Sequence, residues 1–195
     1  MKLEQELEIQ SLLKNWRDER HLTLEMQNEG LLGNLCEEMA EYYRATNESE
    51  KIDALCDIYV FCMNSLDGDL KAIREELERQ IYLRVYQLND LKLFFITEIE
   101  KKLKRLKKEK IIGDFNLFLY VLMENVECEA QALGYDFYKC MMETIKEISS
   151  RTGHYDENIH KFVKDKSEKA VKKWYKADYE KCKTSLNGCF IKHNF

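Results

Sequence analysis

Proline is absent from the 195-residue sequence, and glycine occurs only seven times. All-β sandwiches and barrels need many tight turns, which these two residues usually supply, so the composition favours helices instead. Long apolar runs are absent as well, and residues 1–20 are highly charged, without the apolar core of a signal peptide. We therefore expect a soluble, cytoplasmic protein with no membrane partner.

The seven cysteines contain no C-x-x-C pair. Their odd number and spacing match neither a disulfide framework nor a zinc ribbon, and they favour a reducing compartment. The 31 basic residues are outnumbered by 36 acidic ones, for a net charge of −5. A chain with this balance has no long-range attraction for nucleic acid, so we do not expect nucleic acid as a partner.

Apolar residues recur with the 3.6-residue period of amphipathic helices. The pattern predicts helices over about 3–16, 31–45, 50–66, 114–133 and 136–149, and a helical pair within 70–110. Asp114 is the expected N-cap and Gly134 the expected C-cap of the helix between them. We therefore predict an all-α fold in a single domain spanning residues 1–195.

The predicted helix over 50–66 is apolar around most of its circumference. Its polar residues Asp53, Asp57, Asn64 and Glu50 project into one narrow sector. A helix of this kind is normally buried, so its acidic stripe is expected to face the interior or a cleft.

The preceding helix carries a second acidic face, with Glu38 and Glu41 beside its apolar stripe and Glu37 further out. A short connection makes the two helices antiparallel neighbours and brings Glu38 and Glu41 across from Asp53 and Asp57. Carboxylates crowded in a poorly solvated site repel one another unless a cation neutralises them. Oxygen ligands of this type favour Mg²⁺, with Mn²⁺ as a substitute. The alternative is a solvated face whose acids pair with Arg44, Lys51 or Lys71.

The segment Glu37-Glu38-Met39-Ala40-Glu41, followed by Asp53-Ala54-Leu55-Cys56-Asp57, resembles the all-α nucleoside triphosphate pyrophosphatase superfamily. This superfamily includes MazG, the dimeric dUTPases and the phosphoribosyl-ATP pyrophosphatases, and its pattern is E-E-x-x-E followed by E-x-x-D. The first half matches fully. In the second half Ala54 replaces the Glu and Asp53 supplies an acid one residue earlier, as in some phage MazG-like proteins. Glu50 with Asp53 also fits E-x-x-D, so both ligand registers stay open.

The resemblance implies a helical bundle of that type and a homo-oligomer, either a dimer or a tetramer. Residues 1–66 and 114–150 would form its catalytic core, residues 67–113 a helical insertion, and residues 151–195 a charged C-terminal segment. It also implies a Mg²⁺-dependent reaction that cleaves a (d)NTP between its α and β phosphates, giving a (d)NMP and pyrophosphate.

Each group of residues then has an expected role. The expected metal ligands are Glu38, Glu41, Asp53 and Asp57, and the candidate base for the attacking water is Glu37 or Glu38. A triphosphate also needs cationic side chains. The candidates are Arg17, Arg20, Lys139, Lys146 and Arg151, with Lys161, Lys164 and Lys176 as weaker options.

A non-catalytic helical interaction protein is the competing interpretation. In that case residues 70–110 would form a partner-binding hairpin, and the basic run 101–110 would contact nucleic acid or an acidic protein. A charge run is more often a solvated helix face. Nucleotide turnover with Mg²⁺ distinguishes the two interpretations.

Overall fold

The computed structural model describes residues 1–79, 112–159 and 161–184. Within these ranges the chain is mostly helical, with one small two-stranded sheet, and the predicted all-α class is confirmed. The helices are α1 (Leu3–Asp18), α2 (Leu24–Arg44), α3 (Glu48–Ser65), α4 (Leu70–Arg79), α8 (Ile112–Ala132) and α9 (Phe137–Ser150). They are followed by β1 (Gly153–Asp156), β2 (Lys161–Lys164), the short α10 (Glu168–Val171) and the 3-10 helix η3 (Tyr179–Cys182).

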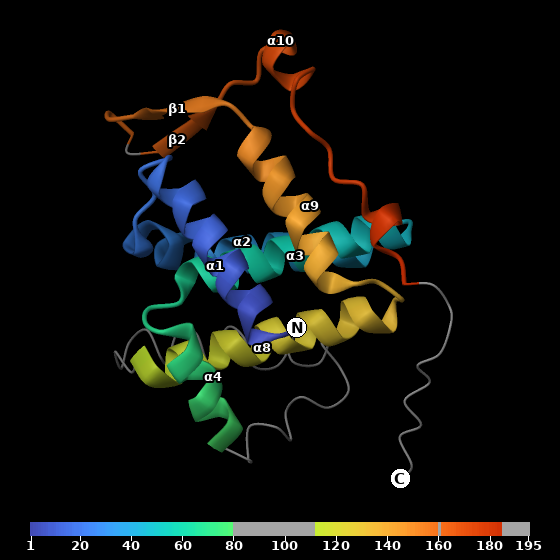
Figure 1. The fold of residues 1–195 in the computed structure, drawn as a ribbon. Coiled ribbons are helices and arrows are strands. Elements are labelled where there is room, and N and C mark those ends of the chain that lie inside the picture. Colours follow the sequence, from blue (N-terminus) through green and yellow to red (C-terminus); the bar gives the residue numbers. More distant parts are fainter. Residues whose placement is uncertain (80–111, 160, 185–195) are drawn as a thin grey trace.

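Helix α3 lies at the centre of the fold, where it contacts α1, α2, α8, α9 and η3 (Figure 1). Its side chains are buried on nearly every side, as its apolar circumference predicts; they include Ile52, Leu55, Cys56, Ile58, Tyr59 and Cys62. Residues 45–47 connect α2 to α3, and the two helices lie side by side. The acidic faces of α2 and α3 are therefore presented by neighbouring helices.

Capping side chains explain where several helices begin. Asn47 accepts a hydrogen bond from the backbone N–H of Glu50 at 3.0 Å, which starts α3 two residues before the predicted position. Thr23 caps α2 in the same way, so that helix begins seven residues earlier than predicted. The prediction of Asp114 as an N-cap is wrong because α8 begins at Ile112 and places Asp114 in its first turn.

Gly134 ends α8 as predicted, with a φ of 85° that favours glycine, and its N–H donates to the Gln131 carbonyl at 2.9 Å. The sequence did not predict the antiparallel hairpin β1–β2 within the charged C-terminal segment, where Gly153 pairs with Lys164. A Cβ at position 153 would lie only 2.2 Å from the Val163 carbonyl oxygen, so glycine permits this pairing.

Residues 175–184, called the C-terminal strap below, run back along α9. The Asp136 N–H donates to the Cys182 carbonyl at 2.8 Å, and the Thr184 N–H donates to the Gly134 carbonyl at 2.8 Å. Near the other end of the strap, the Ala177 N–H donates to Glu147 at 2.7 Å. The strap is therefore fixed to α9 at both ends.

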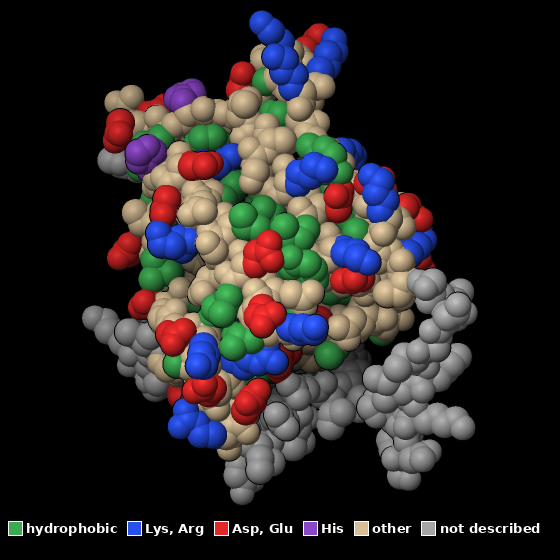
Figure 2. All heavy atoms as spheres, viewed as in Figure 1, with side chains coloured by type: hydrophobic (Ala, Val, Ile, Leu, Met, Phe, Trp, Pro, Cys, Tyr) green, Lys and Arg blue, Asp and Glu red, His purple; other side chains and the backbone are tan. Residues whose placement is uncertain are grey.

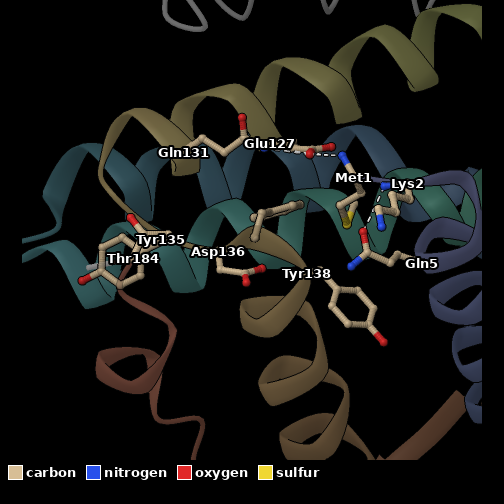
Figure 3. A pocket seen from close by; sticks show the side chains of 10 residues that line it. Met1, Lys2, Gln5, Glu127, Gln131, Tyr135, Asp136, Tyr138 and Thr184 are labelled. Carbon is tan, nitrogen blue, oxygen red and sulfur yellow. Dashed lines mark hydrogen bonds and ion pairs between the residues drawn. The ribbon is translucent and has the colours of Figure 1, made fainter. Parts of the chain in front are cut away.

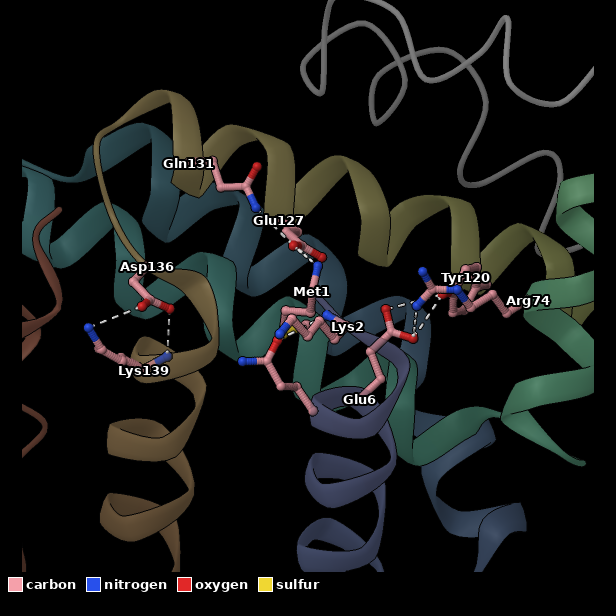
Figure 4. Close-up of polar contacts among 10 residues, drawn as sticks. Met1, Lys2, Glu6, Arg74, Tyr120, Glu127, Gln131, Asp136 and Lys139 are labelled. Atoms are coloured by element: carbon pink, nitrogen blue, oxygen red, sulfur yellow. Dashed lines mark hydrogen bonds and ion pairs between the residues drawn. The ribbon is translucent and has the colours of Figure 1, made fainter. Parts of the chain in front are cut away.

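A polar network inside the fold joins α1, α4 and α8 (Figure 4). The Glu6 side chain is buried and accepts hydrogen bonds from Arg74 at 2.9 Å and from the Tyr120 hydroxyl at 3.0 Å. Because a buried carboxylate is costly without partners, this network fixes α4 against the bundle.

Of the helical pair predicted within 70–110, α4 accounts for residues 70–79. The rest of that prediction, including the basic run 101–110, falls outside the described residues. None of the described helices is long and apolar enough to cross a membrane.

Candidate functional site

Carboxylates from α2 and α3 form the centre of the site. Glu38 is half-buried on α2, and its pKa is raised to about 8, first by burial and then by the charges of Asp57, Glu41, Asp53 and Glu37. Glu38 therefore lies within electrostatic reach of the four other predicted acidic residues. The structure brings together the acids that the sequence placed on facing helices.

Asp57 is also half-buried, and its pKa is raised to about 7. Burial is the main cause and the charge of Asp53 the next, whereas Arg151 and Lys164 oppose the shift. Two neighbouring acids thus hold protons near neutral pH, which is the expected behaviour of carboxyl groups that are both buried and close to other acids.

Asp53 has a direct partner that the sequence did not predict. The hydroxyl of Tyr179, in the strap, donates to Asp53 Oδ1 at 2.7 Å. Although the Asp53 side chain is exposed, surrounding protein limits its hydration and raises its pKa, while the Tyr179 hydrogen bond opposes the shift. Tyr179 lies 126 residues away along the chain, so no local pattern could have identified it.

The two ligand registers differ in their surroundings. Glu50 is exposed, and its carboxylate accepts from the Thr46 N–H at 2.6 Å and the Thr46 hydroxyl at 3.0 Å. These hydrogen bonds lower the pKa of Glu50 and hold its carboxylate at the start of α3. Glu38 interacts with Asp53 and Asp57, which favours the register that contains these two residues.

Cations approach the carboxylates from the C-terminal third of the chain. The charges of Arg151 and Lys176 act on Asp53, and those of Arg151 and Lys164 act on Asp57. These residues come from the end of α9, from β2 and from the strap. Lys and Arg side chains also gather over α10 at the top of the molecule (Figure 2). Positive charge therefore borders the acidic cluster on the hairpin side.

Glu147 is a second residue that the sequence analysis missed. Its Oε1 accepts from Arg151 Nη2 at 2.6 Å, and its Oε2 accepts from the Ala177 N–H at 2.7 Å. Arg151 follows one turn after Glu147, and this i, i+4 spacing of opposite charges was the signal in the sequence that could have indicated the ion pair. Glu147 orients Arg151 and fastens the strap at the same point.

Arg17 and Arg20, both predicted to bind substrate, are engaged with helix ends. Arg17 donates from Nη1 to the Asn64 carbonyl near the end of α3 at 2.7 Å. The buried Arg20 donates to the carbonyls of Ile148 at 3.4 Å and Arg151 at 3.2 Å, at the end of α9. In this conformation both guanidinium groups satisfy backbone acceptors.

The two predicted lysines of α9 lie on exposed positions. Lys139 pairs with Asp136 at 3.2 Å, at the opposite end of α9 from Arg151. Lys146 lies over the ring of Tyr175, with its Nζ 3.9 Å from the ring centroid. Neither lysine is among the leading charges that act on Asp53 or Asp57. The side chain of Lys161 falls outside the described residues.

A cavity of about 390 Å³ lies elsewhere, between the start of α1, the end of α8 and the start of α9 (Figure 3). None of the predicted site residues lines it. Its polar groups largely bond to one another: the Met1 ammonium pairs with Glu127, and Gln131 donates to Glu127 at 2.9 Å. The cavity is therefore separate from the acidic cluster.

Among the described residues, no three His, Cys, Asp or Glu side chains are arranged as a ready metal site. The donor chemistry nevertheless suits a hard cation, because the cluster offers carboxylate oxygens from groups whose pKa values are raised by burial and by neighbouring acids. Because Tyr179 holds Asp53 Oδ1, the side chains of the other acids would have to rotate to share one ion with Asp53.

No protein-family model matches the chain, and no curated protein and no solved structure matches it either. The function is therefore inferred from the sequence pattern and from the geometry described above.

Proposed function

We propose that the protein is a Mg²⁺-dependent nucleotide pyrophosphohydrolase that cleaves a (d)NTP between the α and β phosphates to a (d)NMP and pyrophosphate. The observation that carries this proposal is the acidic cluster of α2 and α3, in which burial and then the charges of neighbouring acids raise the pKa of Glu38 to about 8, bordered by Arg151, Lys164 and Lys176. This chemistry requires carboxylates that bind a metal ion and, beside them, basic side chains that bind the phosphates. The resemblance to the all-α pyrophosphatase superfamily supports the same reaction.

Glu38, Glu41, Asp53 and Asp57 would hold the metal. When bound, Mg²⁺ lowers the pKa of a coordinated water and neutralises phosphate charge. Of the two candidate bases, Glu38 is half-buried beside the other acids, whereas Glu37 is exposed on α2. Glu38 is therefore the better placed of the two to accept a proton from the attacking water, once a bound cation would favour its ionised form.

Arg151 is the best placed cation for the substrate phosphates. A guanidinium can donate two parallel hydrogen bonds to phosphate oxygens, and the bond to Glu147 restricts its orientation. Lys164 and Lys176 add charge from two further segments.

We also propose a homo-oligomer, dimer or tetramer, which light scattering coupled to size-exclusion chromatography tests directly.

The test is incubation with canonical and modified nucleoside triphosphates and Mg²⁺, with pyrophosphate and monophosphate measured together. We expect Mg²⁺-dependent release of both products in equal amounts. Asp57→Asn should lower kcat by at least about 100-fold, since it removes a proposed ligand. Asp18→Asn, at an exposed residue that ends α1 and pairs with Lys14, is the matched control and should retain activity.

Two results together would refute the proposal. One is that no nucleotide is hydrolysed by the unaltered protein. The other is that Mg²⁺ raises the melting temperature of the unaltered protein and of Asp57→Asn equally. The non-catalytic interaction protein would then be the remaining alternative, and most of its predicted partner surface, residues 70–110, falls outside the described ranges.

A further inference from the structure

Tyr179 connects the C-terminal strap to the acidic cluster through a hydrogen bond in a buried setting. Its side chain is only 5 % exposed, and its hydroxyl donates to Asp53 Oδ1 at 2.7 Å. The same hydroxyl oxygen lies 2.9 Å from Thr144 Oγ1 on α9. One hydroxyl therefore bridges α3 and α9 at the edge of the proposed metal site.

The direction of these hydrogen bonds follows from counting protons. A hydroxyl has one proton to donate, and an ionised carboxylate can only accept, so the Tyr179 proton is directed to Asp53. Thr144 is then free to donate either to Tyr179 or to the Cys140 carbonyl, which is 3.0 Å away. Burial, together with the charges of Cys56 and Asp53, raises the pKa of Tyr179 far above its ordinary value, so the hydroxyl stays protonated.

The strap holds Tyr179 in place on both sides. Before it, the Asp178 N–H donates to Glu143 at 3.0 Å and the Ala177 N–H donates to Glu147 at 2.7 Å. After it, the Cys182 carbonyl accepts from the Asp136 N–H at 2.8 Å. Since the backbone is fixed at three points around Tyr179, the hydroxyl has little freedom to follow Asp53 if that side chain rotates.

We infer that Tyr179 is a positioning residue: its buried hydroxyl fixes the rotamer of Asp53 so that the other carboxylate oxygen, Oδ2, is available to a divalent cation held by α2 and α3. This inference rests on the proposed function, because it assigns Tyr179 a task within that metal site. It also makes the C-terminal strap a part of the site, although the strap contributes no ligand.

The expected effect follows from what outer hydrogen bonds do in metal sites. A carboxylate that is oriented before the cation arrives loses less rotational freedom on binding, and loss of such a partner typically weakens metal binding about 10-fold to 100-fold. Because Tyr179 acts through Asp53, its removal should have no additional effect once Asp53 itself has been altered.

The experiment measures Mn²⁺ binding to the full chain by electron paramagnetic resonance, without nucleotide. Tyr179→Phe keeps the ring and removes only the hydroxyl, and we expect its Mn²⁺ dissociation constant to rise about 10-fold. Tyr175→Phe is the matched control, because Tyr175 also lies in the strap and its hydroxyl also donates to a carboxylate, that of Glu143. This control should bind Mn²⁺ as the unaltered protein does, even if both variants lose similar thermal stability.

A double variant completes the test. In an Asp53→Asn background, Tyr179→Phe should change the Mn²⁺ dissociation constant by less than about twofold. Equal Mn²⁺ affinity in Tyr179→Phe and the unaltered protein would overturn the inference about Tyr179 while leaving the proposed metal site intact. Absence of Mn²⁺ binding by the unaltered protein would overturn both. A similar loss of affinity in Tyr175→Phe would show that general loosening of the strap, and not the Asp53 contact, is responsible.

Discussion

Arg151 Nη2 donates to Glu147 Oε1 at 2.6 Å, across one turn at the end of α9. Both side chains are largely buried, with 26 % of the Arg151 and 18 % of the Glu147 side chain exposed. The positive charge of Arg151 acts on both Asp53 and Asp57. The ion pair therefore holds a guanidinium at the border between the acidic cluster and the hairpin, where a substrate phosphate would approach.

Replacing Arg151 should affect substrate binding more than stability. We expect Arg151→Met to raise KM for the nucleotide at least about 10-fold, because it removes a cation that would bind phosphate oxygens. Steady-state kinetics across Mg²⁺ and nucleotide concentrations measures this. Lys139→Met is informative by comparison, since the sequence singled out both residues but Lys139 lies at the opposite end of α9. Its KM should change by less than about twofold; the reverse ranking would contradict the site described above.

The central part of the site could be predicted from the sequence because it depends on one helix and its neighbour. An apolar circumference around Asp53 and Asp57 predicts burial of α3, and the short connection after α2 predicts that Glu38 lies opposite. Both features are local in the chain. The raised pKa of Glu38, to which Asp57 and Asp53 contribute, agrees with that arrangement.

The remaining part depends on contacts between segments that are distant in the sequence. Lys164 approaches on a strand of only four residues, too short and too charged for a clear alternation of apolar and polar positions. Tyr179 reaches Asp53 from a 3-10 turn, which has no apolar period of its own. For Arg20, composition could not distinguish a cation that binds phosphate from one that binds the carbonyls at the end of a helix.

Asp57 should make the metal-free protein less stable as the pH rises. Its pKa is about 7 in the folded protein and 3.8 as its ordinary value, so the folded state binds the proton more tightly. The stability associated with this group is therefore present at low pH and is lost between about pH 4 and pH 7. The asparagine in Asp57→Asn cannot ionise. We therefore expect the free energy of unfolding of this variant, relative to that of the unaltered protein, to be about 2 kcal/mol larger at pH 8 than at pH 5, a figure reduced for partial exposure.

Urea unfolding in the presence of a chelator at both pH values measures this difference. Addition of Mg²⁺ at pH 8 should stabilise the unaltered protein and have little effect on Asp57→Asn. The exposed Asp18→Asn serves as the control: it keeps Asp57, so its stability should change with pH as that of the unaltered protein does. Parallel pH profiles for Asp57→Asn and the unaltered protein would mean that folding does not raise the pKa of Asp57.

Arg20 should contribute mainly to stability. Its guanidinium donates to the Ile148, Ser149 and Arg151 carbonyls at 3.2–3.4 Å, where α9 has no helical N–H to satisfy them. We expect Arg20→Met to lower the free energy of unfolding by about 2 kcal/mol, measured by urea titration, because the part-buried carbonyls of Ser149 and Arg151 lose this donor and the Ile148 carbonyl keeps only Trp16. An unchanged unfolding midpoint combined with a raised nucleotide KM would instead support the substrate-binding role predicted from the sequence.

The Glu6–Arg74 pair predicts a stability effect that depends on pH. Burial raises the pKa of Glu6, while Arg74 and the Tyr120 hydroxyl oppose the shift. Arg74→Met leaves a buried carboxylate without its cation, which should cost about 3 to 5 kcal/mol at pH 8. The pKa of Glu6 then rises further above its unfolded value, so the folded state can take up a proton at pH 5 and the loss there should be smaller.

Urea unfolding at pH 5 and pH 8 measures the effect, and Arg79→Met is the control. Arg79 lies on the same helix, but its side chain is 70 % exposed and its partner is Glu76, so its replacement should cost less than about 1 kcal/mol at either pH. Adding Glu6→Gln to Arg74→Met should abolish the pH dependence, because the amide cannot ionise and can still accept from Tyr120. If Arg74→Met loses equal stability at both pH values, the loss comes from packing of α4 and not from the uncompensated charge of Glu6.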